Sequence, residues 1–72
     1  MDNTKKFTLK ALRVNAGMTQ GEAAEKLGIS AQTLSTWENG TVFPKVPDIT
    51  KIENLYKTSY ADIDFLPRTI SD

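Results

Sequence analysis

The fold of this chain is decided by one stretch, Thr19-Gln-Gly-Glu-Ala-Ala-Glu-Lys-Leu-Gly-Ile-Ser-Ala-Gln-Thr-Leu-Ser-Thr-Trp-Glu-Asn-Gly40. Its first half begins with a capping-box pattern, in which Thr19 and Glu22 can each bind the other's free backbone N–H group. Gly28 is a typical helix stop, because glycine adopts the left-handed conformation without strain. We therefore predict a helix over residues 19–27.

The second half of the stretch has start and stop residues of its own. Ser30 is a favourable N-cap residue, and Ile29 can pack against Leu34 as a hydrophobic staple. Gly40 ends the segment after Asn39. The stretch thus predicts two short helices joined by a tight turn.

The second of these helices has an uncharged outward face. With Leu34 at the centre of the buried side, Trp37 and Glu38 fall inward. The residues that fall outward are Gln32, Ser35, Thr36 and Asn39. Such a face suits the hydrogen-bonding edges of DNA bases. The same face would also be expected of a helix that only meets solvent. This helix alone therefore leaves both interpretations open, contact with bases and a solvated surface.

Three further residues of this region have a predicted role. Glu38 lies on the inward side and needs a partner, for which Arg13 is the best candidate through a bidentate ion pair with a scaffold role. Trp37 is better explained as a core residue than as a contact residue. Gln20, the first residue of its helix, would face a phosphate at that helix N-terminus; the alternative is an ordinary exposed glutamine.

Helices are also predicted on either side of the deciding stretch. Leu9, Leu12 and Ala16 form one helical stripe over residues 8–16, and Gly17 ends it. A fourth helix opens with Pro47 in its first turn. The apolar residues that this helix would bury are Ile49, Ile52 and either Leu55 or Tyr56.

The end of the chain predicts a fifth, short helix. Ser59-x-x-Asp62 resembles a capping box, and the helix would bury Ile63 with Phe65 or Leu66 before Pro67 ends it. No stretch alternates as a strand does, so the prediction is an all-α domain of about five helices. Residues 1–7 are expected to form a flexible N-terminal arm, residues 8–66 the domain and residues 67–72 a C-terminal tail.

Composition narrows the function. The 72 residues are 39% hydrophobic, which allows one small core. Cysteine and histidine are absent, so the usual zinc site, thiolate nucleophile and general base are missing, and we expect no metal, no cofactor, no small-molecule ligand and no enzymatic activity. No apolar run approaches the length of a membrane span, and no secretory signal is present; a cytoplasmic protein is expected.

Charge is balanced overall but not evenly placed. The formal net charge is zero, which is a caution for nucleic-acid binding. Residues 1–45 contain six Lys and Arg against four acids, whereas residues 46–72 contain three against five. The N-terminal two-thirds of the chain is therefore mildly basic, and an asymmetry of this size is weak evidence for a nucleic-acid partner.

A long motif is similar to that of a known family. Its residues here are Leu12-Arg13, Gly17-Met18-Thr19-Gln20, Ala24-Glu25-Lys26-Leu27-Gly28-Ile29-Ser30, Thr33-Leu34-Ser35-Thr36-Trp37-Glu38-Asn39-Gly40 and Pro44. They resemble the helix-turn-helix family of lambdoid phage repressors and Cro proteins, also called the xenobiotic-response-element family. The resemblance covers residues 8–65 and implies a compact five-helix, lambda-repressor-like DNA-binding domain.

The resemblance also implies roles for individual residues. Bases or the groove wall would be contacted by Ser30, Ala31, Gln32 and Thr36. Phosphates would be contacted by Gln20, Thr19, Ser35, Asn39, Thr41 and Lys45. Gln20 would also brace the start of the third helix, and Arg13 with Glu38 would form the family's internal ion pair.

Some positions depart from the family pattern. Ala23 is smaller than usual, with Met18 as a candidate to fill the gap, and Lys57 stands where glycine often ends the fourth helix. Val42 and Phe43 replace basic loop residues. Phe43 would either fold back onto the core or join Val42 in a dimer contact.

Two functions remain in competition. The first is a sequence-specific transcriptional regulator, a phage-type repressor that binds a double-stranded DNA operator as a homodimer. The second is a protein-interaction module, such as an antitoxin or anti-repressor component that has kept the fold; zero net charge and the apolar pair Val42 and Phe43 motivate it. The chain could be a complete Cro-like protein or the DNA-binding part of a longer repressor.

Overall fold

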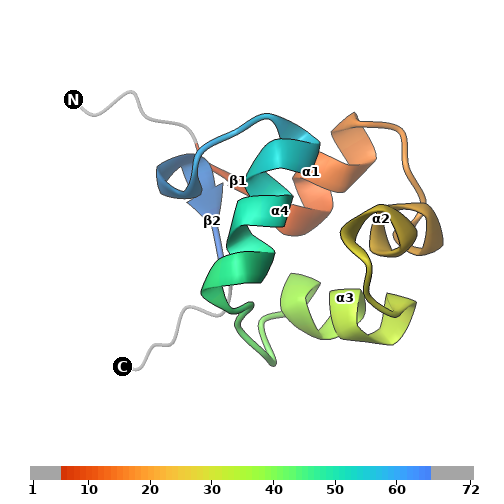
Figure 1. The fold of residues 1–72 in the computed structure, drawn as a ribbon. Helices are drawn as coiled ribbons and strands as arrows, with labels where there is room; N and C mark the ends of the chain where they lie inside the picture. Colours follow the sequence, from red (N-terminus) through yellow and green to blue (C-terminus); the bar gives the residue numbers. More distant parts are fainter. Residues whose placement is uncertain (1–5, 66–72) are drawn as a thin grey trace.

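The computed structural model describes residues 6–65. Along the chain, the elements are β1 (Phe7–Thr8), α1 (Leu9–Asn15), α2 (Gln20–Leu27), α3 (Ala31–Glu38), α4 (Val46–Tyr56), the 3-10 turn η1 (Tyr60–Asp62) and β2 (Ile63–Asp64) (Figure 1). The predictions for residues 1–5 of the arm, for the tail, and for Leu66 and Pro67 fall outside the described residues.

The first three helices begin where a hydroxyl side chain caps them. The side chain of Thr8 accepts a hydrogen bond from the Ala11 N–H at 3.1 Å, and that of Ser30 accepts one from the Thr33 N–H at 3.0 Å. Thr19 and Glu22 form the reciprocal capping box expected from the sequence. These local bonds satisfy N–H groups that have no partner inside the helix.

The helix ends are less uniform than the starts. Gly28 ends α2 with a φ of 76°, a left-handed conformation that costs glycine nothing. Lys57 adopts the same conformation at the end of α4, with a φ of 54°. A side chain with a Cβ is strained there, so the replacement of glycine by Lys57 has a structural cost.

The core lies where α4 meets the other helices. In Figure 1, α4 runs through the middle of the domain between the β1–β2 pair and α2. Leu34 of α3 and Ile52 of α4 are fully buried, and the remaining buried apolar side chains are Leu9, Ala23, Ala24, Leu27, Trp37 and Ile63. Met18 packs against this cluster. No helix within residues 6–65 is long and apolar enough to cross a membrane.

The predicted fifth α-helix is wrong. Residues 60–62 form a single 3-10 turn, in which the Tyr60 N–H donates to the Glu53 carboxylate at 2.7 Å. The chain then extends as β2 and pairs in parallel with β1, Phe7 opposite Ile63 and Thr8 opposite Asp64. Pairing as a strand buries Ile63, which is 3% exposed. The domain is therefore mostly helical rather than all-α.

Smaller differences concern single side chains. Phe7 belongs to β1 and not to a flexible arm. Ala16 is exposed, although its spacing places it on the stripe of Leu9, and Ile49 is only half-buried. Ala16 is the C-cap residue of α1, one position beyond the last residue of the helix, Asn15.

Lys57→Gly should stabilise the domain by about 0.5–1 kcal/mol, because glycine removes the left-handed strain at the end of α4. Lys51→Gly is the matched control: Lys51 is exposed inside α4, where glycine should cost about 1 kcal/mol. Urea unfolding of both variants measures the difference. A loss of stability in Lys57→Gly would contradict the assignment of strain to this position.

Candidate nucleic-acid interface

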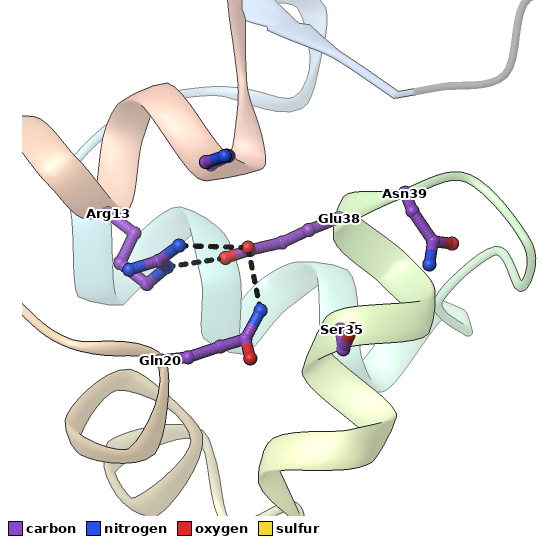
Figure 2. A pocket seen from close by; sticks show the side chains of 6 residues that line it. Arg13, Gln20, Ser35, Glu38 and Asn39 are labelled. Atoms are coloured by element: carbon purple, nitrogen blue, oxygen red, sulfur yellow. Dashed lines mark hydrogen bonds and ion pairs between the residues drawn. The ribbon is translucent and has the colours of Figure 1, made fainter.

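A buried carboxylate joins three helices. Glu38, at the end of α3, is 8% exposed. Arg13 of α1 donates from Nε to Glu38 Oε2 at 2.7 Å and from Nη2 to Oε1 at 3.1 Å. Gln20 of α2 donates from Nε2 to Oε1 at 3.1 Å. Figure 2 shows the three side chains converging on one point.

Two side chains at this network, Arg13 and Tyr56, have raised pKa values. The hydrogen bond to Glu38 raises the pKa of Arg13 above its ordinary value, so the guanidinium stays charged. Arg13 also donates from Nη1 to the backbone oxygen of Met18 at 3.1 Å, which ties in the loop between α1 and α2. Burial, with a contribution from the charge of Glu38, raises the pKa of the nearby Tyr56 hydroxyl to about 12.

Gln20 contacts the end of α3, whereas the family pattern suggests a brace at its start. Its Nε2 points to Glu38 and its oxygen points away (Figure 2). A primary amide has two N–H donors, so one remains for an external acceptor. Because the Gln20 side chain reaches Glu38, it lies near the C-terminal end of α3, where Asn39 is the C-cap residue.

The start of α3 presents the predicted base-contacting residues. Ala31 and Gln32 are exposed. The Ser30 hydroxyl donates to Thr33 Oγ1 at 2.9 Å, and the Thr36 hydroxyl donates to the Thr33 backbone oxygen at 2.6 Å. The Gln32 side chain has no hydrogen-bond partner within residues 6–65, so its amide donors and acceptor are available there. Thr36 uses its hydroxyl hydrogen and retains its methyl group and acceptor lone pairs.

Asn39 and Thr41 act as a unit after α3. The Thr41 N–H donates to Asn39 Oδ1 at 2.9 Å and its hydroxyl donates to the same oxygen at 2.6 Å. The Thr41 N–H is also shared with the Thr36 oxygen. Both donors of Thr41 are thus used inside the protein. Because both bind the side-chain oxygen of Asn39, the NH₂ group of Asn39 stays available.

Comparison with known proteins shows the family of this chain. A family model described as helix-turn-helix matches residues 9–63. The chain belongs to the Cro/C1-type helix-turn-helix family. A relative from Bacillus subtilis (strain 168), the HTH-type transcriptional regulator ImmR, is 45% identical over 51 residues. These residues are 71% of this chain and 40% of the relative, so the chain matches less than half of that protein's length.

Membership identifies α2 and α3 as the helix-turn-helix of a DNA-binding domain. The family consists of transcriptional regulators without enzymatic activity, as expected from the sequence. Within residues 6–65, no group of acidic side chains could hold a metal ion. Thr19 is exposed at the start of α2, and Ser35 is half-buried on α3.

The loop after the helix-turn-helix exposes the two apolar residues that depart from the family pattern. Val42 is 46% exposed and Phe43 is 52% exposed. The Phe43 ring does not enter the core; its centroid lies 5.0 Å from that of Phe65, whose ring lies 5.5 Å from that of Tyr60. Lys45 is exposed directly before α4.

Lys10 was not identified from the sequence as part of the candidate interface. Lys10 of α1 borders the same hollow as Gln20, Ser35 and Asn39. Its position three residues before Arg13 is the available signal, because residues i and i+3 share a helix face.

Glu38→Gln should destabilise the domain by about 3 kcal/mol, because it leaves the guanidinium of Arg13 without its counter-charge in a mostly buried site. The matched control, Glu25→Gln, changes an exposed residue of α2 and should shift stability by less than about 0.5 kcal/mol. Urea unfolding at neutral pH measures both. Equal stability of the two variants would show that the buried network is not a major support of the fold.

Proposed function

We propose that this domain belongs to a sequence-specific transcriptional regulator, a phage-type repressor that inserts α3 into the major groove of its operator. The observation that supports this most is the exposed, uncharged start of α3, where Gln32 has no partner within residues 6–65. An unpaired, exposed amide among small side chains fits a groove of base edges better than a protein core. The helix-turn-helix membership supports the same role.

Each base-contacting residue has a distinct chemical role in this proposal. The Gln32 amide can bind adenine through one donor and one acceptor. Ala31 and the Thr36 methyl group provide apolar contact with thymine methyl groups. Ser30, whose hydroxyl caps α3, would contact the groove wall rather than select a base.

Phosphate contacts would hold α3 in register. Gln20 and Asn39 have free amide N–H groups at the end of α3, and Thr19 and Ser35 have hydroxyls nearby. Lys45 would reach the backbone from the following loop. Contacts of this kind position a protein on DNA without selecting sequence, so they complement Gln32.

A homodimer is the second part of the proposal. With zero net charge, the chain can neutralise few phosphates, so one domain alone would bind weakly. Phe43, Val46 and Tyr60 are exposed apolar residues that border one hollow of about 390 Å³. Val42, also exposed, directly precedes Phe43. In the proposal, a second copy covers this surface, and the resulting dimer must hold its two α3 helices about 34 Å apart to reach successive major grooves.

The same apolar surface supports the alternative function, a protein-interaction module of the antitoxin or anti-repressor kind. The two functions differ in what covers Val42 and Phe43 and in what contacts α3. In the alternative, another protein occupies the apolar surface and Gln32 has no base to select.

Selection of bound sites from random DNA at low salt tests the proposal. We expect one preferred sequence containing two inverted half-sites, as a two-fold dimer requires. Gln32→Ala should weaken binding to that site by about 1–3 kcal/mol and relax the preference at one base pair. Asn54→Ala, which removes an exposed amide from α4, is the control and should change neither.

Two results would count against parts of this proposal. Failure to recover any preferred sequence would refute sequence-specific binding. A preferred sequence that Gln32→Ala binds with unchanged selectivity would remove the role of Gln32 while leaving DNA binding intact.

A further inference from the structure

The hollow bordered by the loop after α3, by α4 and by η1 has a lining of its own. Its volume is about 390 Å³. No residue predicted to contact DNA borders it. The loop lines it through Phe43, η1 through Tyr60, and α4 through Val46, Ile49, Thr50 and Glu53. The lining is therefore mostly apolar, with two aromatic rings and one carboxylate.

The two aromatic walls are held in place by a third ring. Phe43 and Tyr60 are each about half exposed. The centroid of the Phe65 ring lies 5.0 Å from that of Phe43 and 5.5 Å from that of Tyr60. Phe65 thus gathers rings from two separate segments at one hollow. The face of an aromatic ring attracts a cation as well as apolar groups.

The carboxylate of the lining is fixed beside one of these rings. Glu53 is half-buried, and its Oε2 accepts a hydrogen bond from the Tyr60 N–H at 2.7 Å. Glu53 forms no ion pair with any partner in residues 6–65. It is also the one charged residue of this part of the chain that borders the hollow. The hollow therefore carries one negative charge without a counter-charge.

These features together select the chemistry of a ligand. A neutral or anionic molecule in the hollow would cover the charge of Glu53 without compensating it, which is costly. An ammonium group on an apolar body compensates the carboxylate, contacts the ring faces and covers the apolar walls. The volume falls within the range of small-molecule sites, about 300–1,000 Å³.

We infer that this hollow binds an organic monocation, with the ammonium group between Glu53 and the Tyr60 ring and the apolar body against Phe43 and Val46. The inference goes beyond the proposed function and assigns a small-molecule site to a chain whose composition led us to expect none. The proposed dimer covers the same hollow, so the cation and a second copy would exclude each other. That consequence rests on the proposed function, whereas binding of the cation does not.

A titration with two probes of nearly the same shape tests the inference. Benzyltrimethylammonium is the cation, and 2-methyl-1-phenylpropan-2-ol is its neutral counterpart. Backbone amide chemical shifts, followed by NMR at constant ionic strength, report binding of each. We expect the cation to bind with a Kd of about 1–10 mM, as its small size allows, with the largest changes at Phe43, Val46, Glu53 and Tyr60. The alcohol should bind at least about tenfold more weakly, because it leaves the carboxylate unpaired.

Glu53→Gln tests the role of the charge. Glutamine keeps the shape of the side chain and an oxygen that can accept from the Tyr60 N–H. This variant should bind the cation about tenfold more weakly and the alcohol as the unmodified chain does. Glu25→Gln removes the same charge from an exposed position on α2, away from the hollow, and should change neither affinity. Thermal unfolding of both variants shows whether the fold is kept.

Three outcomes would overturn the inference. The first is equal affinity of the unmodified chain for the cation and the alcohol, a result that needs no variant. The second is full cation affinity in Glu53→Gln. The third is a set of shifts at the hollow that follows protein concentration and not the cation, which would make a second copy the occupant. None of these measurements contains DNA, so their failure leaves the proposed function standing, and failure of DNA binding leaves the cation site standing.

Discussion

The buried carboxylate of Glu38 is the constraint on which the rest of this domain depends. An ionised group removed from water is costly unless charged and hydrogen-bonded partners surround it. Arg13 provides the charge and two of the hydrogen bonds, and Gln20 provides a third. Because these partners come from α1 and α2, satisfying one side chain at the end of α3 sets the position of all three helices.

This arrangement decides which parts of α3 are available. The apolar side, with Leu34 and Trp37, is buried against the core, and the end is held by Glu38. What remains is an exposed start around Gln32 and a polar hollow beside Asn39. In the proposed function, the start of α3 distinguishes base pairs and its end lies against the DNA backbone. The Glu38 network need not touch DNA itself, but it sets the distance between these two surfaces.

Local patterns predicted much of this structure, and long-range contacts explain what was missed. The caps at Thr19 and Ser30 depend on neighbours three residues away and could be predicted from sequence, as could the inward position of Glu38. The β1–β2 pair joins residues separated by most of the chain, and each strand is too short to show alternation. The packing of the three helices against one another also decides that the Gln20 side chain reaches the end of α3. The same packing brings Lys10 to the hollow that Gln20 borders.

The central claim is that the face formed by the start of α3 and the hollow at its end is the surface that meets DNA. Backbone amide chemical shifts, followed by NMR as the selected duplex is added, test it most directly. The account predicts that the largest changes fall on residues 31–36 and around Lys10, Gln20 and Asn39, with the outer side of α4 unaffected. Changes confined to Val42, Phe43 and Tyr60, with none on α3, would contradict it.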